Sequence, residues 1–172
     1  DLKRLVGDTS VSHLGFVLLG VFAWNPLGIQ GAVMEMLAHG ISTGALFILV
    51  GQVQERTHTR EIDRMGGLWS TMPRWSGAGF LFTMAAIGLP GLGNFIAEVL
   101  VLLGTYRVSV GLTVAAATGI LVGTFYGMRL VQKVFHGPNR NGWTLPDLGA
   151  REILILVPLI LSIVWLGIYP QP

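Results

Sequence analysis

The chain has 172 residues and a formal net charge of +2, and 52% of its residues are hydrophobic whereas only 12% are charged. A soluble domain carries about 25% charged residues, so this composition and a mean hydropathy of +0.65 indicate a membrane protein. The small net charge gives no basis for nucleic-acid binding, and the absence of cysteine excludes disulfides, thiolate metal sites and iron–sulfur ligation. The sequence starts Asp-Leu-Lys-Arg, without an initiating Met or a signal-peptide pattern, so we expect a piece of a longer polypeptide.

Five apolar runs predict an all-α, polytopic membrane protein with a single membrane domain over residues 1–172. We expect about five transmembrane helices, at approximately 5–24, 29–53, 75–106, 108–134 and 152–169. The third run is much longer than the roughly 20 residues that one straight crossing needs, which favours two half-helices or a kink. The fourth run is rich in Gly and Ala, which is typical of helices that pack closely on their neighbours.

The third run, which contains no Lys or Arg, has helix-breaking residues near its middle. These residues are Gly88, Pro90, Gly91 and Gly93. In lipid, irregular backbone is tolerated only where protein or a hydrated cavity covers it, and interrupted helices often mark the ion or substrate site of a transporter. Glu98 follows the break, and its carboxylate needs a partner or water because an ionised side chain in hydrocarbon is costly. We therefore interpret 88–93 as a hinge that opens the helix beside an acid.

Basic residues divide unequally between the two ends of the predicted helices. Five crossings place the amino terminus and the loops 54–74 and 129–151 on one side, together with ten of the eleven Lys and Arg residues. These ten are Lys3, Arg4, Arg56, Arg60, Arg64, Arg74, Arg129, Lys133, Arg140 and Arg151. The other side holds only Arg107. Because cytoplasmic loops carry an excess of Lys and Arg, we predict that the basic loops are cytoplasmic.

Three ionisable residues fall near the midplane of the predicted helices. At a rise of about 1.5 Å per residue, His13, His39 and Glu98 lie at matched depth in the first, second and third runs. One interpretation is a proton relay, since His titrates near neutral pH and carboxylates take up and release protons. The alternative is that each His makes a hydrogen bond between helices. The matched depth beside a broken helix favours transport.

Glu35 lies four residues before His39 and therefore on the same face of the second helix. Its residue type and spacing leave three roles open. These roles are proton exchange with His39, a hydrogen bond that holds the His39 imidazole in one tautomer, and contact with a neighbouring subunit. We include Glu35 with Glu98, His39 and His13 as the candidate proton-relay residues.

Other kinds of site find no support in the residue pattern. The stretch G-L-P-G-L-G-N at 88–94 has the spacing of a glycine-rich phosphate loop, but no strand precedes it and no Lys-Ser or Lys-Thr follows. The four His residues lie in different segments and lack the spacing of a metal site. We therefore predict no catalytic residue, no bound cofactor and no metal in this chain.

Seven motifs carry a specific family resemblance: D-L-K-R-L-V at 1–6, S-V-S-H-L-G at 10–15, Q-G-A-V-M-E-M-L-A-H-G at 30–40, E-R-T-H-T-R-E at 55–61, M-G-G-L-W at 65–69, G-L-P-G-L-G-N-F-I-A-E at 88–98 and G-I-Y-P-Q-P at 167–172. They resemble the carboxy-terminal portion of the M-type antiporter-like subunits of bacterial NADH:quinone oxidoreductase, the respiratory complex I. The corresponding mitochondrial protein is NADH dehydrogenase subunit 4. The resemblance implies a fold with two inverted helix repeats, of which this chain holds the end of the second repeat and the closing helix.

The resemblance also implies roles for the candidate residues. It assigns His13 and His39 to a polar axis through the membrane arm, and Glu98 to the acid on the broken helix, as a terminal proton site. It implies proton translocation coupled to quinone reduction elsewhere in the complex, in the bacterial plasma membrane. The implied partners are other membrane subunits, including neighbouring antiporter-like subunits, besides the lipid bilayer and protons. Flavin, iron–sulfur clusters and quinone are expected in other subunits.

Two alternatives remain beside this interpretation. An antiporter-like subunit of a multisubunit cation/proton antiporter or of a membrane-bound hydrogenase shares the broken-helix acid and differs in its partners. A structural scaffold would use the same His and Glu residues only as hydrogen bonds between helices. The chain also departs from the expected family pattern, because Glu35 stands where we expect Gln and Asp8 where we expect Tyr. Both departures add a carboxylate near the predicted path.

Overall fold

The structure, a computed structural model, describes residues 1–139 and 141–170. Arg140 of the basic loop, and Gln171 and Pro172 of the last motif, lie outside the described residues. The regular elements of the described chain are α1 (Leu2–Phe22), α2 (Pro26–Thr57), a 3-10 turn (Ile62–Arg64), α3 (Leu68–Thr71), α4 (Pro73–Ala86), α5 (Gly93–Tyr106), α6 (Val110–Leu130) with a π-helical extension (Val131–Phe135), and α7 (Ala150–Ile168).

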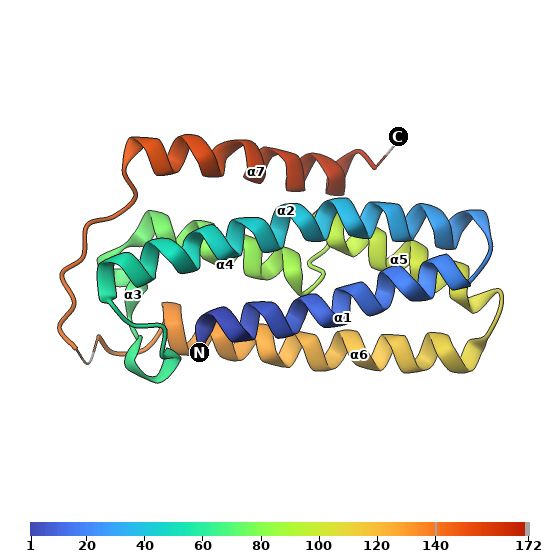
Figure 1. Cartoon of the computed structure of the whole chain (residues 1–172), viewed down its shortest axis with the longest axis horizontal. Coiled ribbons are helices and arrows are strands. Elements are labelled where there is room, and N and C mark those ends of the chain that lie inside the picture. Colours follow the sequence, from blue (N-terminus) through green and yellow to red (C-terminus); the bar gives the residue numbers. More distant parts are fainter. Residues whose placement is uncertain (140, 171–172) are drawn as a thin grey trace.

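Four of these helices are long and apolar enough to cross a membrane, namely α1, α2, α6 with its extension, and α7. The other two long helices, α4 and α5, have 14 residues each. They follow one another along the bundle and together make the remaining crossing (Figure 1). The prediction of an all-helical membrane fold with about five crossings is therefore confirmed, and the third predicted run consists of two helices.

Polar caps determine where several helices begin. The Asp1 side chain accepts hydrogen bonds from two backbone N–H groups in the first turn of α1. Asn25 caps α2 in the same way and is followed by Pro26, whose missing N–H is harmless at this position. As a result, α2 begins before the predicted start at 29 and continues to Thr57. The Ser109 side chain caps α6.

The long helices lie side by side and alternate in direction (Figure 1). The amino terminus, α3, the start of α4 and the connection from α6 to α7 all lie at one end. We call this the basic end. It is formed by residues 1–4, 54–74, 129–139 and 141–151, which carry nine of the ten basic residues predicted for that side. The α1–α2 and α5–α6 connections lie at the opposite end. This is the alternation that five crossings require.

Small residues bring α1, α2 and α5 into close contact. A Cβ added at Gly31 of α2 would lie 2.6 Å from the backbone N of Val101 in α5. A Cβ added at Gly28 of α2 would lie 2.6 Å from the carbonyl O of Gly20 in α1. Such approach of backbones requires small residues, as in other membrane-helix interfaces. The three helices that carry the candidate ionisable residues are therefore held against one another.

Candidate functional site

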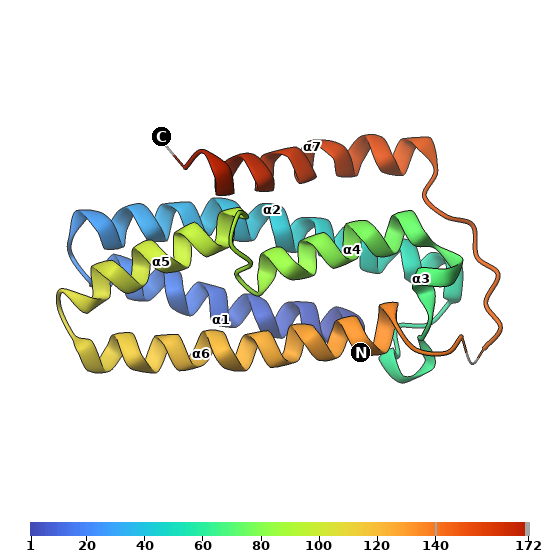
Figure 2. The same cartoon turned by 180° about the vertical axis from the view of Figure 1, so that it is seen from behind.

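The third crossing is interrupted between α4 and α5, where residues 87–92 form a connection outside both helices (Figure 2). Gly88 and Gly91 have φ angles of +75° and +96°, which side chains other than glycine rarely allow. Pro90 has no backbone N–H with which to continue the helix, so it cannot donate to the carbonyl four residues before it. That carbonyl belongs to Ala86, the last residue of α4. The break therefore leaves the Ala86 carbonyl available to another donor.

His13 of α1 uses this carbonyl. Its ring is buried, and Nε2 lies 3.0 Å from the Ala86 carbonyl O. Its other nitrogen, Nδ1, lies 2.7 Å from Oε1 of Glu35 in α2 and 3.9 Å from Oε1 of Glu98 in α5. The imidazole of His13 thus stands between groups from α2, α4 and α5.

The break also makes room for Glu98. A Cβ added at Gly88 would overlap the Glu98 carboxylate, so the acid is accommodated only because this position is glycine. Glu98 is buried on α5. Gly93, the first residue of α5, permits close packing of another kind, because a Cβ added there would lie 3.0 Å from Cβ of Leu166 in α7. Of the predicted hinge residues, Gly88 therefore makes room for the Glu98 carboxylate, and Gly93 allows the start of α5 to pack closely against α7.

His39 extends the cluster along α2. Its ring stacks on that of His13, with centroids 4.7 Å apart and an angle of 28° between the planes. The hydroxyl Oγ1 of Thr43, one turn further along α2, lies 3.1 Å from Nδ1 of His39. His39 is only partly buried. The stacked rings therefore join α1 to a less buried face of α2.

The cluster contains two carboxylates, and the charged contacts described for them involve only His13. Glu35 is fully buried, and its Oε2 makes no hydrogen bond to the described residues. Both amide atoms of the buried Asn94, on the same face of α5 as Glu98, are likewise without a described partner. An ionised carboxylate in such surroundings is costly unless a positive charge or a proton compensates it. Among the described residues, these carboxylates can therefore be neutralised by a proton on the carboxylate itself or by a protonated His13.

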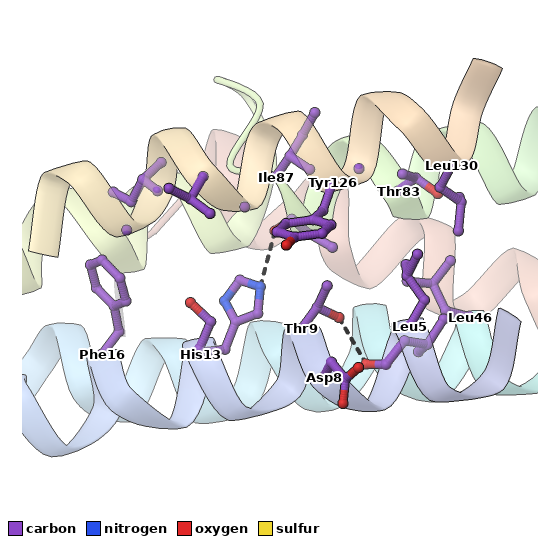
Figure 3. Close-up of a pocket in the computed structure, with 18 of the residues that line it drawn as sticks. Leu5, Asp8, Thr9, His13, Phe16, Leu46, Thr83, Ile87, Tyr126 and Leu130 are labelled. Carbon is purple, nitrogen blue, oxygen red and sulfur yellow. Dashed lines mark hydrogen bonds between the residues drawn. The ribbon is translucent and has the colours of Figure 1, made fainter. Parts of the chain in front are cut away.

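A cavity of about 700 Å³ borders the cluster. Its polar lining residues at the start of α1 and along it are Asp1, which caps the helix, and Arg4, Asp8, Thr9, Ser12 and His13. Glu98 also lines the cavity, and Figure 3 shows His13 on the α1 side, opposite Ile87 and Tyr126. The cavity therefore runs from the basic end to the cluster, and its volume is ample for water molecules.

The cluster also offers atoms of the kind that bind metal ions. One ligand atom from each of His13, Glu35 and His39 lies within 4.8 Å of the other two. Two imidazoles that bind one ion direct their in-plane lone pairs at a common point about 2.0–2.1 Å from each nitrogen. The stacked rings, at 28° to each other, instead keep their lone pairs in two nearly parallel planes. This ring arrangement does not direct the two imidazoles at one ion.

The structure brings together all four residues that the sequence indicated. His13, His39 and Glu98, expected at matched depth on separate helices, lie in one cluster with Glu35. The hydrogen bond of Glu35 is with His13 of the neighbouring helix, a partner that was not among the roles left open for it. Their role as a proton relay remains a prediction.

Three contributors were not predicted: the Ala86 carbonyl, Thr43 and Asn94. A spacing signal existed for each, because Ala86 lies four residues before Pro90, Thr43 lies four residues after His39, and Asn94 shares the acid's helix face. Spacing identifies residues on one face, but it does not say which atom of another helix that face meets. These contacts depend on the tertiary packing.

The fold and the site together define a multi-pass helical membrane protein with an acid beside a broken helix. The chain belongs to the family described as "NADH:quinone oxidoreductase/Mrp antiporter, TM", which matches residues 1–123. Membership of this family confirms the resemblance seen in the sequence motifs.

The chain is similar throughout its length to bacterial subunits of this family. It is 42% identical over 172 residues to NADH-quinone oxidoreductase subunit M of Pseudomonas aeruginosa, and 40% identical over 175 aligned residues to that of Escherichia coli. Each alignment covers 100% of this chain and 34% of the relative, so the chain spans about a third of their length. The structure matches a chain of respiratory complex I from Thermus thermophilus with a TM-score of 0.95 and 34% identity, covering 99% of this chain and 36% of that one.

Proposed function

We propose that the chain forms part of a proton-translocating membrane-arm subunit of NADH:quinone oxidoreductase, with Glu98, His13, Glu35 and His39 as proton-relay residues. Quinone reduction in other subunits would supply the driving force, transmitted as changes of charge near the midplane. The family and the likeness to subunit M of two bacteria support the assignment to this complex. The observation that carries the relay is the contact of one imidazole nitrogen with two buried carboxylates.

Proton transfer requires a donor and an acceptor within hydrogen-bond distance, or one water molecule between them. The separation of 2.7 Å between His13 Nδ1 and Glu35 Oε1 meets this condition directly. The 3.9 Å between His13 Nδ1 and Glu98 Oε1 needs a small movement of either side chain. The cavity along α1 supplies a route for water from the basic end, so we propose that protons reach Glu98 from that end.

The proposal includes the setting of the chain. Residues 1–172 would be a single membrane domain of a longer subunit in the bacterial plasma membrane, with the basic end in the cytoplasm. Other membrane subunits, including neighbouring antiporter-like subunits, would cover helix faces that are open here, and only 6% of the crossing segment of α6 is buried. Flavin, iron–sulfur clusters and quinone would lie in other subunits.

Replacement of Glu98 tests the relay. In the assembled complex, Glu98→Gln should lower NADH-driven proton pumping into inverted membrane vesicles by at least about tenfold, because a proton-transferring group contributes about 10²–10⁴-fold. Native electrophoresis should show an assembled complex, because Gln has nearly the same shape. Glu55→Gln is the matched control, since it removes an exposed carboxylate from α2. Unchanged pumping in an assembled Glu98→Gln complex would overturn the relay and favour the scaffold.

A second candidate is a subunit of a cation/proton antiporter or of a membrane-bound hydrogenase, because the family description itself includes the Mrp antiporter. The candidates differ in their partners rather than in the buried cluster. Affinity purification from membranes separates them. Co-purification of flavin and iron–sulfur subunits that oxidise NADH supports the oxidoreductase, whereas a set of membrane subunits alone supports the antiporter. Hydrogenase activity in the purified complex would support the third assignment.

A further inference from the structure

The two nitrogens of His13 face partners of different kinds. Nε2 lies 3.0 Å from the Ala86 carbonyl O, and a carbonyl oxygen only accepts hydrogen bonds. Nε2 must therefore carry a hydrogen to form this bond. Pro90 removes the backbone donor that would otherwise compete for the same carbonyl. The helix break thus holds His13 in a state with Nε2 protonated.

This restriction decides which atom of His13 exchanges protons. If Nε2 keeps its hydrogen, neutral His13 has a bare Nδ1, and a second proton on the ring can bind only there. Nδ1 faces Glu35 Oε1 at 2.7 Å and Glu98 Oε1 at 3.9 Å. A bare nitrogen and an ionised carboxylate at 2.7 Å would be two acceptors without a hydrogen between them. The short contact therefore requires a proton between His13 and Glu35.

We infer that Glu35 and Glu98 share one proton through Nδ1 of His13, while the Ala86 carbonyl released by the helix break keeps Nε2 protonated. This inference rests on the proposed proton relay and assigns Glu35 a direct part in it. Glu35 is then a proton-holding residue rather than a group that only orients His39. Its full burial, and the absence of a described partner for Oε2, fit a carboxyl group that is protonated for part of the cycle.

The transfer conserves charge at each step. In the first step the O–H bond at Glu35 Oε1 breaks and an N–H bond forms at His13 Nδ1, which leaves a Glu35 carboxylate beside an imidazolium. In the second step this N–H bond breaks and an O–H bond forms at Glu98 Oε1. The cluster carries one net negative charge before, between and after the two steps. The reverse sequence returns the proton to Glu35.

The groups around Glu35 explain why the shared proton stays among Glu35, His13 and Glu98. His13 faces it from α1, Glu98 approaches the same imidazole from α5, and His39 lies one turn away on α2. The ion-pair contacts described for Glu35 and Glu98 include no Lys or Arg. Within these contacts, neither carboxylate is therefore held in its ionised form by a permanent positive charge.

The test compares Glu35→Gln, Glu35→Asp and the control Glu55→Gln in the assembled complex. Proton pumping and NADH oxidation are measured in inverted membrane vesicles across the pH range in which the complex is stable. We expect Glu35→Gln to slow pumping by about tenfold and to remove one titration step from its pH profile, because coupled groups titrate as a set. Glu35→Asp should keep that step at a reduced rate, and Glu55→Gln should match the unmodified complex.

The two proposals fail in different ways. If Glu98→Gln abolishes pumping while Glu35→Gln leaves its rate and pH profile unchanged, the sharing of a proton through Glu35 is wrong and the relay stands. If neither variant affects pumping, the proposed function is wrong. Should Glu35→Gln not assemble, Glu35→Asp decides the matter. The shorter Asp side chain lengthens the 2.7 Å contact with His13, so the proposal expects slower pumping and a titration step that is kept but moved in pH. A purely structural Glu35 predicts an unaltered pH profile for any variant that assembles, and that result would overturn the sharing of a proton through Glu35.

Discussion

Carboxylates at the basic end and carboxylates in the middle of the bundle are neutralised by different means. At the basic end, Glu152 lies 2.7 Å from Nη2 of Arg56, and Asp63 lies 2.6 Å from Nζ of Lys133. In the middle, the ion-pair contacts of Glu35 and Glu98 are both with His13, which is charged only when it binds a proton. A permanent cation keeps its partner ionised, whereas an imidazole lets the charge move. The basic end therefore holds its carboxylates with permanent cations, and the proposed relay assigns proton exchange to the middle.

Asp147 shows the structural use most clearly. Burial opposes its ionisation, but hydrogen bonds from the backbone N–H groups of Arg74, Leu148 and Trp75, with the nearby Arg74 charge, lower its pKa. Asp147 thereby ties the connection before α7 to the first turn of α4. Its carboxylate stays charged over the whole physiological pH range, in contrast to a group that exchanges protons.

The largest expected effect comes from placing a permanent cation in the middle. His39→Lys puts an ammonium group one turn from Glu35, which would hold the carboxylates ionised as Arg56 does at the basic end. We expect NADH-driven pumping in the assembled complex to fall by about tenfold or more. His58→Lys, a change of the same kind at the exposed carboxy-terminal end of α2, is the control. Normal pumping by assembled His39→Lys would show that the carboxylates in the middle function equally well beside a permanent cation, which would contradict the comparison.

An intermediate effect is expected at the break. Gly88→Ala combines an unfavourable positive φ with overlap of the new Cβ and the Glu98 carboxylate. A strained residue of this kind costs about 1–3 kcal/mol, so we expect a lower thermal transition of the complex and reduced pumping. Gly77→Ala in α4 is the matched control, because a Cβ there meets no atom within 4 Å. Equal stability and pumping of the two variants would contradict the described geometry of the break.

The smallest effect is expected at the basic end. The lowered pKa of Asp147 means that its stabilising contribution is present above the ordinary value of 3.8 and is lost as the pH falls below it. Asp147→Asn should therefore destabilise the protein by about 1 kcal/mol near neutral pH, and the difference from the unmodified protein should vanish in acid. Thermal unfolding in detergent as a function of pH measures this.

Asp63→Asn provides the reference for that measurement. Asp63 and Lys133 are both largely exposed, so water screens their ion pair and we expect no measurable change in stability. A loss of stability for Asp63→Asn as large as that for Asp147→Asn would show that surface pairing, rather than backbone hydrogen bonding, holds the basic end together.

Much of the fold was predictable because its signals are local. The apolar runs indicated the membrane crossings, and the cluster of glycines around Pro90 indicated the broken helix. Helix starts were less predictable, since the caps at Asp1 and Asn25 involve polar residues outside the apolar runs. The short helices within residues 54–74 were not predicted, because they lie in a polar loop without apolar periodicity.

The candidate site was predictable in its members but not in its connections. Residue type and depth alone pointed to His13, His39 and Glu98, and spacing added Glu35 beside His39. The structure instead directs Glu35 at His13, 22 positions away in sequence. Which partner a buried side chain meets depends on how two helices are rotated and spaced, and the close glycine contacts at Gly28 and Gly31 determine that spacing here.

The sequence by itself determined that the chain lies in a membrane, that one crossing is broken and that acids and imidazoles lie near mid-depth, because hydropathy, charge and helix-breaking residues act locally. Only the tertiary structure decided that the Ala86 carbonyl, which Pro90 leaves without a backbone donor, meets Nε2 of His13. These two residues are 73 positions apart in the sequence. The tertiary structure likewise decided that Nδ1 stands between two carboxylates from different helices. These relations arise from packing between helices, and they determine which atoms are available to a proton.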